Sequence, residues 1–315
     1  MSTAIGPVAD ALADPLASQK PASLWRDTLK NVLRQRSAIV GLVFLGFLLA
    51  VAIFAPLIAT HPPNQPMIGI EEGIKVRQAP CIHLLGCPET QPQHLMGLDG
   101  NARDVFSRVV FASRISLQIG FLTVGFAIVI GTIIGALAGY FGARVDNVLM
   151  RLMDVLLAFP SLLLAIAIVT VLGQSLINAQ LAIGIVAIPV FARVMRASVL
   201  SIREQDFVAA SRALGESSGG ILLRRVMPNA LTPLIVQGTL GIAGAIIDVA
   251  ALSFLGMGAQ TPLAEWGSMI GDERNAVFSA PHLILFPGLA IVLTCLAFNL
   301  LGDGIRDALD PRLNR

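Results

Sequence analysis

The sequence contains little charge and few aromatic side chains. Of its 315 residues, 13% are charged and 6% are Phe, Trp or Tyr, with a single tyrosine. A soluble domain typically carries about 25% charged residues, so a soluble globular protein is excluded. The chain is instead 55% hydrophobic, with a mean hydropathy of +0.77. These values indicate an integral membrane protein.

Motifs of nucleotide-hydrolysing and hydrolytic enzymes are also missing. A phosphate-binding P-loop needs Gly-Lys-Ser or Gly-Lys-Thr, yet Lys20, Lys30 and Lys75 follow Gln, Leu and Ile. The sequence has no HExxH motif. We therefore expect no catalytic residue and no cofactor bound by this chain. We expect no nucleic-acid partner either.

Cysteine is scarce, and two of the three cysteines lie together in CIHLLGC. Cys81 and Cys87 form either a small disulfide or a pair of free thiols. Three histidines lie nearby, at positions 61, 83 and 94, but their spacing with the cysteines matches no zinc pattern, so we expect no metal. Cys295 lies within an apolar run, where it is expected to serve packing.

Six apolar runs are long enough to cross a bilayer core of about 30 Å, which takes roughly 20 helical residues. They lie near residues 38–58, 115–140, 148–172, 176–200, 230–256 and 283–302. The alternation typical of membrane β-strands is absent. The sequence therefore predicts an all-α protein with six transmembrane helices. A short turn at residues 173–175 predicts that the third and fourth form a hairpin.

Basic residues are unevenly distributed among the segments between these runs. If the N-terminus is cytoplasmic, most of the 22 Lys and Arg lie on the inside, as membrane proteins prefer. We therefore predict that both termini are cytoplasmic. The predicted division is a cytoplasmic tail at 1–37 with an interfacial helix at 21–36, a first transmembrane helix at 38–58, a periplasmic loop or lid at 59–113, a five-helix core at 114–305, and a cytoplasmic tail at 306–315.

Small residues and prolines mark points within the predicted spans. Gly131, Gly135 and Gly139 repeat every four residues, which predicts close helix packing rather than chemistry. Pro160 and Pro189 permit kinks in the third and fourth spans.

Charged residues within the spans are candidates for function, because intramembrane charge is expensive. Asp248, about 17 residues into the fifth span, could line a substrate path or pair with a neighbouring helix or a companion subunit. Arg151 and Asp154 lie one helical turn apart, which predicts a local ion pair.

A polar segment at residues 203–229 interrupts the apolar runs. Its pattern predicts a helix from Asp206 to Leu214, with Phe207, Ala210 and Leu214 on one face. Gly215 and the Gly219–Gly220 pair should end that helix, and Pro228 precedes the fifth span. Such a helix either docks in a groove on a soluble partner or lies on lipid.

This segment resembles the coupling-loop motif of bacterial ABC importer permeases. Ala209, Ala210 and Ser211 stand at its EAA triplet and Gly215 at its glycine, and the stretch from Arg225 to Pro228 stands at its end. The sequence departs from the motif where Ala209 replaces glutamate and Arg225 replaces isoleucine. Asp206 offers a negative charge three residues upstream of the triplet.

Three further stretches are similar to the C-type permease of dipeptide and oligopeptide importers. The outer stretch HLMGLDGNARDVFSR keeps seven residues of that branch's motif: His94, Gly97, Asp99, Arg103, Asp104, Ser107 and Arg108. It departs from the motif at Leu98 and Ala102. The other two stretches are ALSFLGMGAQTPLAEWG, at 251–267, and FNLLGDGIRDALDPR, at 298–312. Together the resemblance covers about residues 25–313.

The resemblance implies the type I ABC importer permease fold in a bacterial inner membrane. It also implies a second permease, two cytoplasmic ATPases that bind ATP and magnesium, a periplasmic or lipid-anchored binding protein, and surrounding lipid. The implied substrates are dipeptides or short oligopeptides, although relatives with this signature also carry glutathione, nickel chelates or haem. Two other classes stay open: a proton-coupled secondary transporter, and a channel or scaffold subunit.

Overall fold

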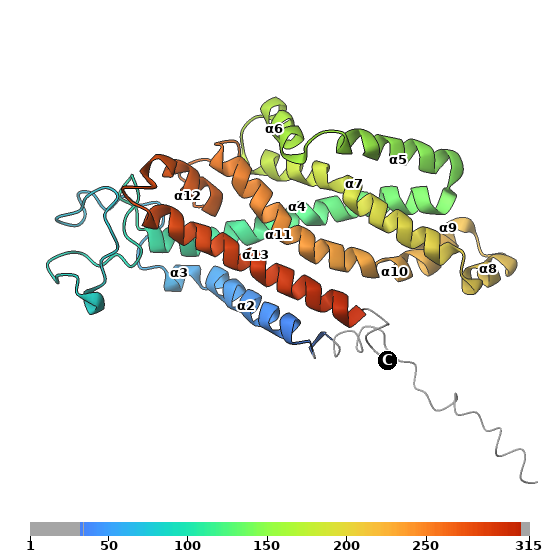
Figure 1. Ribbon diagram of the computed structural model, residues 1–315, viewed down its shortest axis with the longest axis horizontal. Coiled ribbons are helices and arrows are strands. Elements are labelled where there is room, and N and C mark those ends of the chain that lie inside the picture. Colours follow the sequence, from blue (N-terminus) through green and yellow to red (C-terminus); the bar gives the residue numbers. More distant parts are fainter. Residues whose placement is uncertain (1–31, 34, 310–315) are drawn as a thin grey trace, which may run out of the picture.

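The computed structural model describes residues 32, 33 and 35–309, and within them the protein is helical (Figure 1). The elements are α2 (Arg36–Ile53), α3 (Ala55–Ile58), η2 (His83–Leu85), α4 (Val105–Phe141), α5 (Ala143–Leu157), α6 (Ser161–Leu172), α7 (Leu176–Arg203), α8 (Asp206–Ala213), α9 (Ser218–Gly220), η3 (Ile221–Val226), α10 (Met227–Ala230), α11 (Thr232–Phe254), α12 (Trp266–Asp272), η4 (Arg274–Ala276) and α13 (His282–Leu309). Extended backbone pairs at isolated bridges in residues 59–104, between α3 and α4, which we call the outer segment after the predicted topology.

Five of these helices are long and apolar enough to cross a membrane: α2, α4, α7, α11 and α13. They run along the length of the molecule, with the outer segment at one end and α8 and α9 at the other (Figure 1). A sixth span is reached by counting α5 and α6 together. The predicted number of six is therefore met only if one span is broken.

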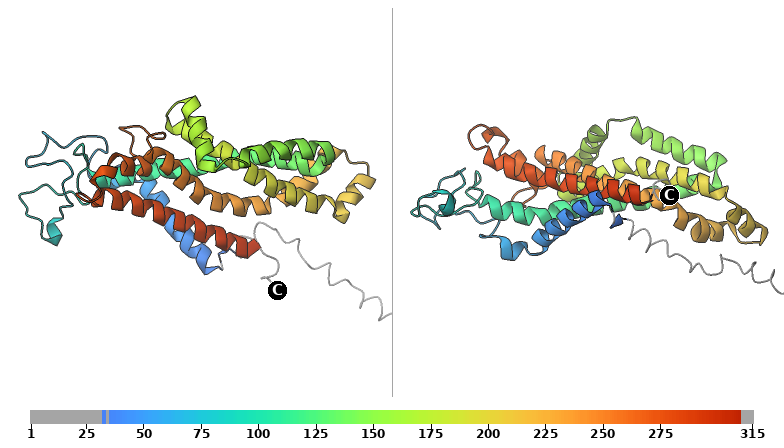
Figure 2. Two further views of the ribbon diagram at one scale, coloured as in Figure 1. Left: turned by 45° about the horizontal axis from the view of Figure 1, so that its top comes forward. Right: turned by 60° about the horizontal axis from the view of Figure 1, so that its bottom comes forward.

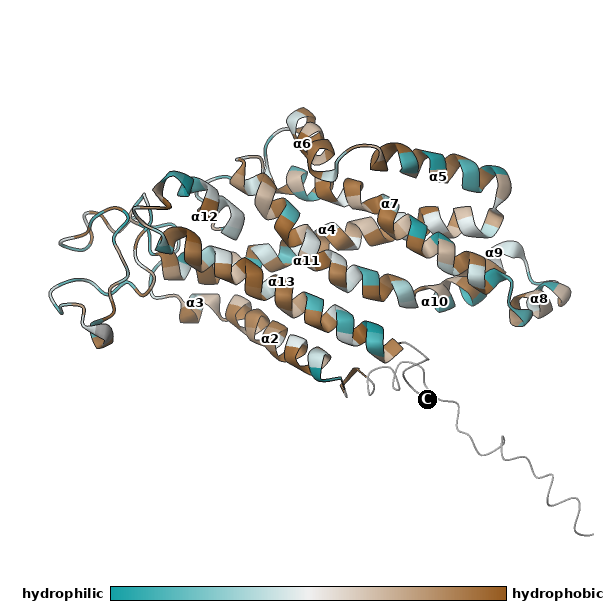
Figure 3. Ribbon diagram, viewed as in Figure 1, coloured by the Kyte–Doolittle hydropathy of each residue, from teal (hydrophilic) through white to brown (hydrophobic). Residues whose placement is uncertain are grey.

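The third span is not the continuous helix that the sequence predicted. α5 and α6 meet at a 90° bend, and the break lies immediately before Ser161. Pro160 lacks an N–H group and disfavours helical backbone in the residue before it, so the helix ends there. α5 carries several hydrophilic residues along its length, while α6 is mostly apolar (Figure 3). Only α6 forms the predicted apolar hairpin with α7.

The second span is longer than its apolar run. α4 begins at Val105 because Asp104 caps it: the Asp104 side chain accepts a hydrogen bond from the Ser107 backbone N–H at 2.8 Å. The first ten residues of the helix include Arg108 and Arg114, which lower the local hydropathy below that of a membrane run. The outer loop therefore ends at residue 104 rather than 113.

The glycine stripe brings α4 and α7 into direct backbone contact. A Cβ atom on Gly131 would lie 2.7 Å from the Cβ of Phe191, and one on Gly139 would lie 2.9 Å from the carbonyl oxygen of Arg196. Both distances are too short for a larger residue, so the prediction of a packing role is confirmed. Cys295 is buried on α13, as predicted for a packing residue.

α2 packs against α13 through a second set of close approaches. A Cβ on Gly41 would lie 2.7 Å from the Leu301 backbone nitrogen, and Gly304 faces Ala38 across the same contact. The two helices cross at an angle in the turned views (Figure 2). Most of the predicted interfacial helix, residues 21–31 and 34, and the tail from residue 310 onward lie outside the described residues.

Candidate functional site

The polar segment begins with the predicted helix, α8, and a sharp turn. The Glu216 N–H donates to the Ser211 carbonyl at 3.2 Å, and the Gly215 N–H donates to the Arg212 carbonyl at 3.0 Å. These two bonds form a Schellman cap, which requires a left-handed residue after the helix. Gly215 supplies it, with φ of +82°.

One side of α8 is buried and the other is open. Val208 is fully buried and belongs to the main core with Ile221 and Val226. Phe207 remains 39% exposed and Leu214 88% exposed. An apolar face on a polar segment is thus available to a partner or to lipid.

The second half of the segment is helical, contrary to prediction. Gly219 and Gly220 do not break the chain, because the Ser217 hydroxyl accepts the Gly220 N–H at 3.2 Å and starts α9. The backbone continues through the π-helical η3 into α10, where Pro228 lies in the first turn and its missing N–H costs little. Arg225 forms an ion pair with Glu216 at 3.2 Å.

Asp248 lies on α11 beside a cavity of about 240 Å³. The cavity is bordered by α4, α7, α11 and the break between α5 and α6, where Phe159 and Ser161 line it. Thr123, Ser161 and Gln237 contribute uncharged polar side chains, while most of the lining is apolar. Among the described residues, none forms an ion pair with the Asp248 carboxylate. The site therefore offers one carboxylate to a mostly apolar space.

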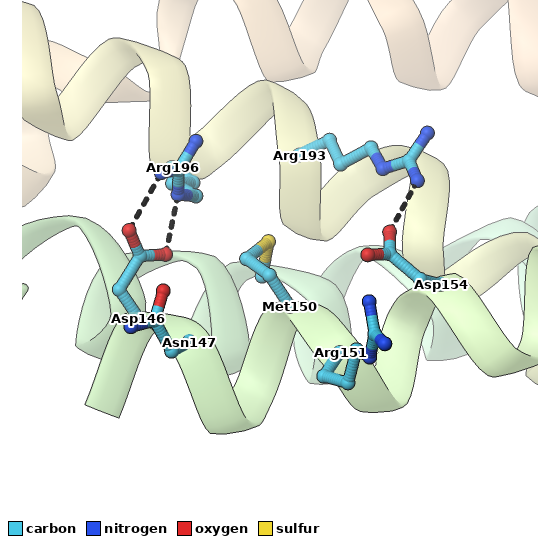
Figure 4. Close-up of a pocket in the computed structure, with 7 residues that line it drawn as sticks. All are labelled: Asp146, Asn147, Met150, Arg151, Asp154, Arg193 and Arg196. Atoms are coloured by element: carbon cyan, nitrogen blue, oxygen red, sulfur yellow. Dashed lines mark hydrogen bonds and ion pairs between the residues drawn. The ribbon is translucent and has the colours of Figure 1, made fainter. Parts of the chain in front are cut away.

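A second hollow, of about 700 Å³, lies between α5 and α7 (Figure 4). The Arg196 side chain donates to both Asp146 oxygens, at 2.5 and 2.6 Å. The Arg193 side chain donates to Asp154 at 2.6 Å. The predicted pairing of Asp154 with Arg151 is therefore wrong, because Asp154 turns toward the facing helix. These ion pairs hold the polar side of α5 on α7.

The outer motif residues gather at the start of α4. His94 and Asp104 are buried, and His94 Nδ1 lies 2.9 Å from Asp104 Oδ1. Burial opposes charge on His94, but hydrogen bonds and charges from Asp104 and Glu71 outweigh it and raise the pKa of His94. Burial likewise opposes ionisation of Asp104, yet hydrogen bonds from His94 and Ser107 lower the pKa of Asp104.

The remaining motif residues connect separate loops. Asp99 accepts the Arg103 N–H at 2.8 Å and the Arg103 guanidinium at 2.7 Å. The Arg108 guanidinium donates to the carbonyls of Pro63 at 3.0 Å and Pro262 at 3.4 Å. Gly97 has φ of +79° and lies against the Gln78 carbonyl, where a Cβ would clash. Arg108 thus joins the start of α4 to the loop that follows α3 and to the loop that follows α11.

Cys81 and Cys87 are joined in a disulfide, the first of the two alternatives that the sequence left open. The bond closes a small loop that contains His83, whose Nε2 lies 2.8 Å from the Gln91 carbonyl oxygen. This loop and α8 lie at opposite ends of the molecule (Figure 1).

Comparison with protein families identifies two parts of the chain. Residues 131–315 match the family described as binding-protein-dependent transport system inner membrane component. Residues 23–80 match the N-terminal TM domain of oligopeptide transport permease C. The first match alone spans more than half of the sequence. The chain belongs to this family.

Curated relatives of this transport permease cover nearly its whole length. The dipeptide transport system permease protein DppC of Alkalihalophilus pseudofirmus is 44% identical over 297 residues, covering 92% of this chain and 91% of the relative. The di/tripeptide permease DppC of Pseudomonas aeruginosa and the glutathione permease GsiD of Escherichia coli are each 42% identical, with the same coverage.

A solved structure confirms the predicted importer fold. A chain of the methionine ABC transporter MetNI, in an inward-facing conformation, superposes with a TM-score of 0.55 at 19% identity. The match covers 97% of that chain but 64% of this permease. This permease therefore adds about a third of its length to the shared fold.

Sequence reasoning missed several residues that complete these sites. Glu71 contacts His94 at 3.2 Å, and Glu273 pairs with Arg77 at 2.8 Å and accepts the Gly100 N–H at 2.6 Å. These partners lie outside the recognised motifs. No local pattern identifies a carboxylate whose partner is 196 residues away.

Proposed function

We propose that this permease is one of two membrane subunits of an ABC importer for dipeptides or short oligopeptides. The 44% identity to a dipeptide transport permease, over 92% of this chain and 91% of the relative, carries the proposal. Its companions are a second permease, two cytoplasmic ATPases that bind ATP and magnesium, and a periplasmic or lipid-anchored binding protein. Both termini lie in the cytoplasm of a bacterial cell, at the inner membrane.

The coupling role falls to α8 and the turn that follows it. The exposed side chains of Phe207 and Leu214 would enter a groove on an ATPase subunit, while Val208 anchors the helix to the membrane core. Closure of the ATPases would then move α8, and through η3 and α10 it would move α11. The motif residues involved are Asp206, Ala209, Ala210, Ser211, Gly215, Arg225 and Pro228. Transport and ATP hydrolysis would thereby bias each other.

The substrate path is proposed to pass the cavity beside Asp248. A free peptide carries an α-ammonium group, and the Asp248 carboxylate is the charge that this lining offers to it. The cavity is also next to the break between α5 and α6, so a bend at Pro160 would change its shape. A companion subunit that supplies a cation to Asp248 is the competing role.

Glutathione is the second candidate substrate, because the Escherichia coli glutathione permease is 42% identical over the same share of both chains. It is itself a short peptide with an α-ammonium group, so the Asp248 cavity does not separate the two substrates.

Uptake assays distinguish these candidates and the rival classes. A strain lacking this gene should lose ATP-dependent uptake of labelled dipeptides, and should regain it with the full set of subunits. Restored uptake of glutathione without dipeptides would replace the proposed substrate. Uptake that persists with ATPase-inactive partners and follows the proton gradient would refute the importer mechanism itself. Copurification with the ATPase is the matching biochemical measurement.

A further inference from the structure

Two histidines and two carboxylates meet in the outer segment. His61 follows α3, at the exit of the first span, and Asp104 begins α4. His94 lies between them and is buried, as is Asp104. One ligand atom from each of His61, His94 and Asp104 lies within 4.8 Å of the other two. Residues that are 33 or more positions from His61 are therefore gathered around one point.

The Glu71 carboxylate lies beside both histidine rings, hydrogen-bonded to His94 and within ion-pair distance of His61. His94 Nε2 lies 3.2 Å from Glu71 Oε2, and His61 Nε2 lies 3.4 Å from Glu71 Oε1. A carboxylate that accepts the Nε2–H group leaves the Nδ1 lone pair free as a ligand. Both Nδ1 atoms face Asp104 Oδ1, at 2.9 Å from His94 and 3.9 Å from His61.

Asp104 is held so that one oxygen is available. Its Oδ2 accepts the Ser107 N–H at 2.8 Å as the cap of α4. Its Oδ1 is directed to the two histidines. His61 is positioned in turn by its backbone N–H, which donates to the Ser107 hydroxyl at 3.0 Å. Helix capping and the loop contact thus place the three ligand atoms independently of any ion.

We propose that His61, His94 and Asp104 bind a divalent cation of the zinc class through two Nδ1 atoms and one carboxylate oxygen. Zinc accepts this ligand set at about 2.0–2.2 Å from each atom, which places tetrahedral ligands about 3.3–3.5 Å apart. The distances from Asp104 Oδ1 to the two Nδ1 atoms, 2.9 Å for His94 and 3.9 Å for His61, lie below and above this range. The histidine–carboxylate pairs with Glu71 are the supporting contacts that metal-binding imidazoles usually have.

A bound cation would clamp the exit of the first span to the start of α4. The Thr60 hydroxyl, 2.9 Å from His61 Nδ1, would move aside or approach the fourth coordination position. The competing arrangement is a protonated His94 between Asp104 and Glu71 with no metal, which satisfies the same hydrogen bonds. Metal binding would displace that proton, so the two arrangements exclude each other.

This site differs from the one considered in the sequence. Cys81 and Cys87 are bonded to each other, and His83 contacts the Gln91 carbonyl instead of the cluster. We expected no metal because the spacing of the three histidines and two cysteines matched no zinc pattern. That set of residues did not include Asp104 or Glu71.

The test is zinc binding by the full-length chain, purified without a polyhistidine tag and stripped with a chelator. We expect one zinc per chain by elemental analysis and calorimetric titration. His61→Ala should abolish stoichiometric binding, and Glu71→Gln should weaken it by about 10- to 100-fold, the usual effect of losing a supporting hydrogen bond. His83→Ala is the matched control, since it removes a histidine of the same segment outside the cluster, and should bind as the unaltered protein does.

Two outcomes would overturn the proposal. The first is an unaltered chain that binds no more zinc than His61→Ala. The second is equal loss of zinc in His83→Ala and in His61→Ala, which would mark general surface binding. If His61→Ala fails to insert or fold, the comparison of the unaltered chain with Glu71→Gln and His83→Ala still decides the question.

Discussion

The turn at Gly215 allows a matched test of the coupling segment, in which the same substitution is made at two glycines. Gly215 has φ of +82°, and no atom lies within 4 Å of the position that a Cβ would take, so Gly215→Ala adds backbone strain without a clash. Left-handed backbone costs a non-glycine residue about 1–2 kcal/mol. Gly219 is equally open but lies in α9 without a positive φ, so Gly219→Ala should stabilise its helix by up to about 1 kcal/mol.

Nothing packs on the turn at Gly215, so in the free Gly215→Ala permease it can relax to an unstrained backbone, and docking of α8 in the conformation seen here must restore the strain. A cost of about 1–2 kcal/mol corresponds to about 5- to 30-fold weaker binding. The measurement is titration of the permease in lipid nanodiscs with the purified ATPase subunit, followed by peptide uptake in cells. Equal affinities for the Gly215→Ala and Gly219→Ala proteins would refute the reasoning. Both substitutions add the same methyl group to an open position, but only Gly215 has left-handed backbone.

Three further predictions concern the substrate path, the hollow between α5 and α7, and the topology. Asp248→Asn should lower peptide uptake about tenfold or more, from the roughly 1.5–3 kcal/mol of a charged hydrogen bond, with assembly unchanged; weakened copurification with the second permease would instead assign Asp248 to the subunit interface. A double-mutant cycle on Asp146 and Arg196, read by thermal unfolding, should give a coupling energy of about 0.5–3 kcal/mol, and the more exposed ion pair in the same hollow should give less. Single cysteines at Ser217 and Gln91, in a cysteine-free background, should react with an impermeant reagent in intact cells at Gln91 alone, and labelling at Ser217 would reverse the proposed orientation.

Features that depend on neighbouring residues were predictable from the sequence. The start of α8 at Asp206 and its end before Gly215 follow from the local pattern, and the structure has both. The spacing of the three stripe glycines likewise predicted a close helix contact. Such signals lie within one or two helical turns, so a single sequence contains them in full.

Features that depend on distant partners were not predictable. Asp154 was assigned to Arg151, one turn away, but it pairs with Arg193, which lies 39 residues away. His94 was recognised as part of a motif, whereas its partner Glu71 lies 23 residues earlier, outside any motif. Proximity in sequence alone adds little to the stability of an ion pair. The partner of Asp154 is therefore determined by the helix that packs opposite it, α7.

The break in the third span shows why proline is an ambiguous signal. Pro160 lies at a 90° bend, while Pro189 and Pro287 lie inside the continuous helices α7 and α13. Neighbouring helices can satisfy the backbone groups that a proline frees, so the residue permits a break without requiring one. At Pro160 the helix also changes from the half-polar α5, held on α7 by ion pairs, to the apolar α6. The two halves therefore need different surroundings, and a bend provides them.

That bend also determines what Asp248 can do. Phe159 and Ser161, on either side of Pro160, line the same cavity as Asp248. A straight third span would not have the turn that places both residues there. The charge could be found in the sequence because it interrupts an apolar run, but its access to a cavity follows from the break. The candidate path thus combines Asp248, which the hydropathy pattern reveals, with the bend at Pro160, which depends on how the helices pack.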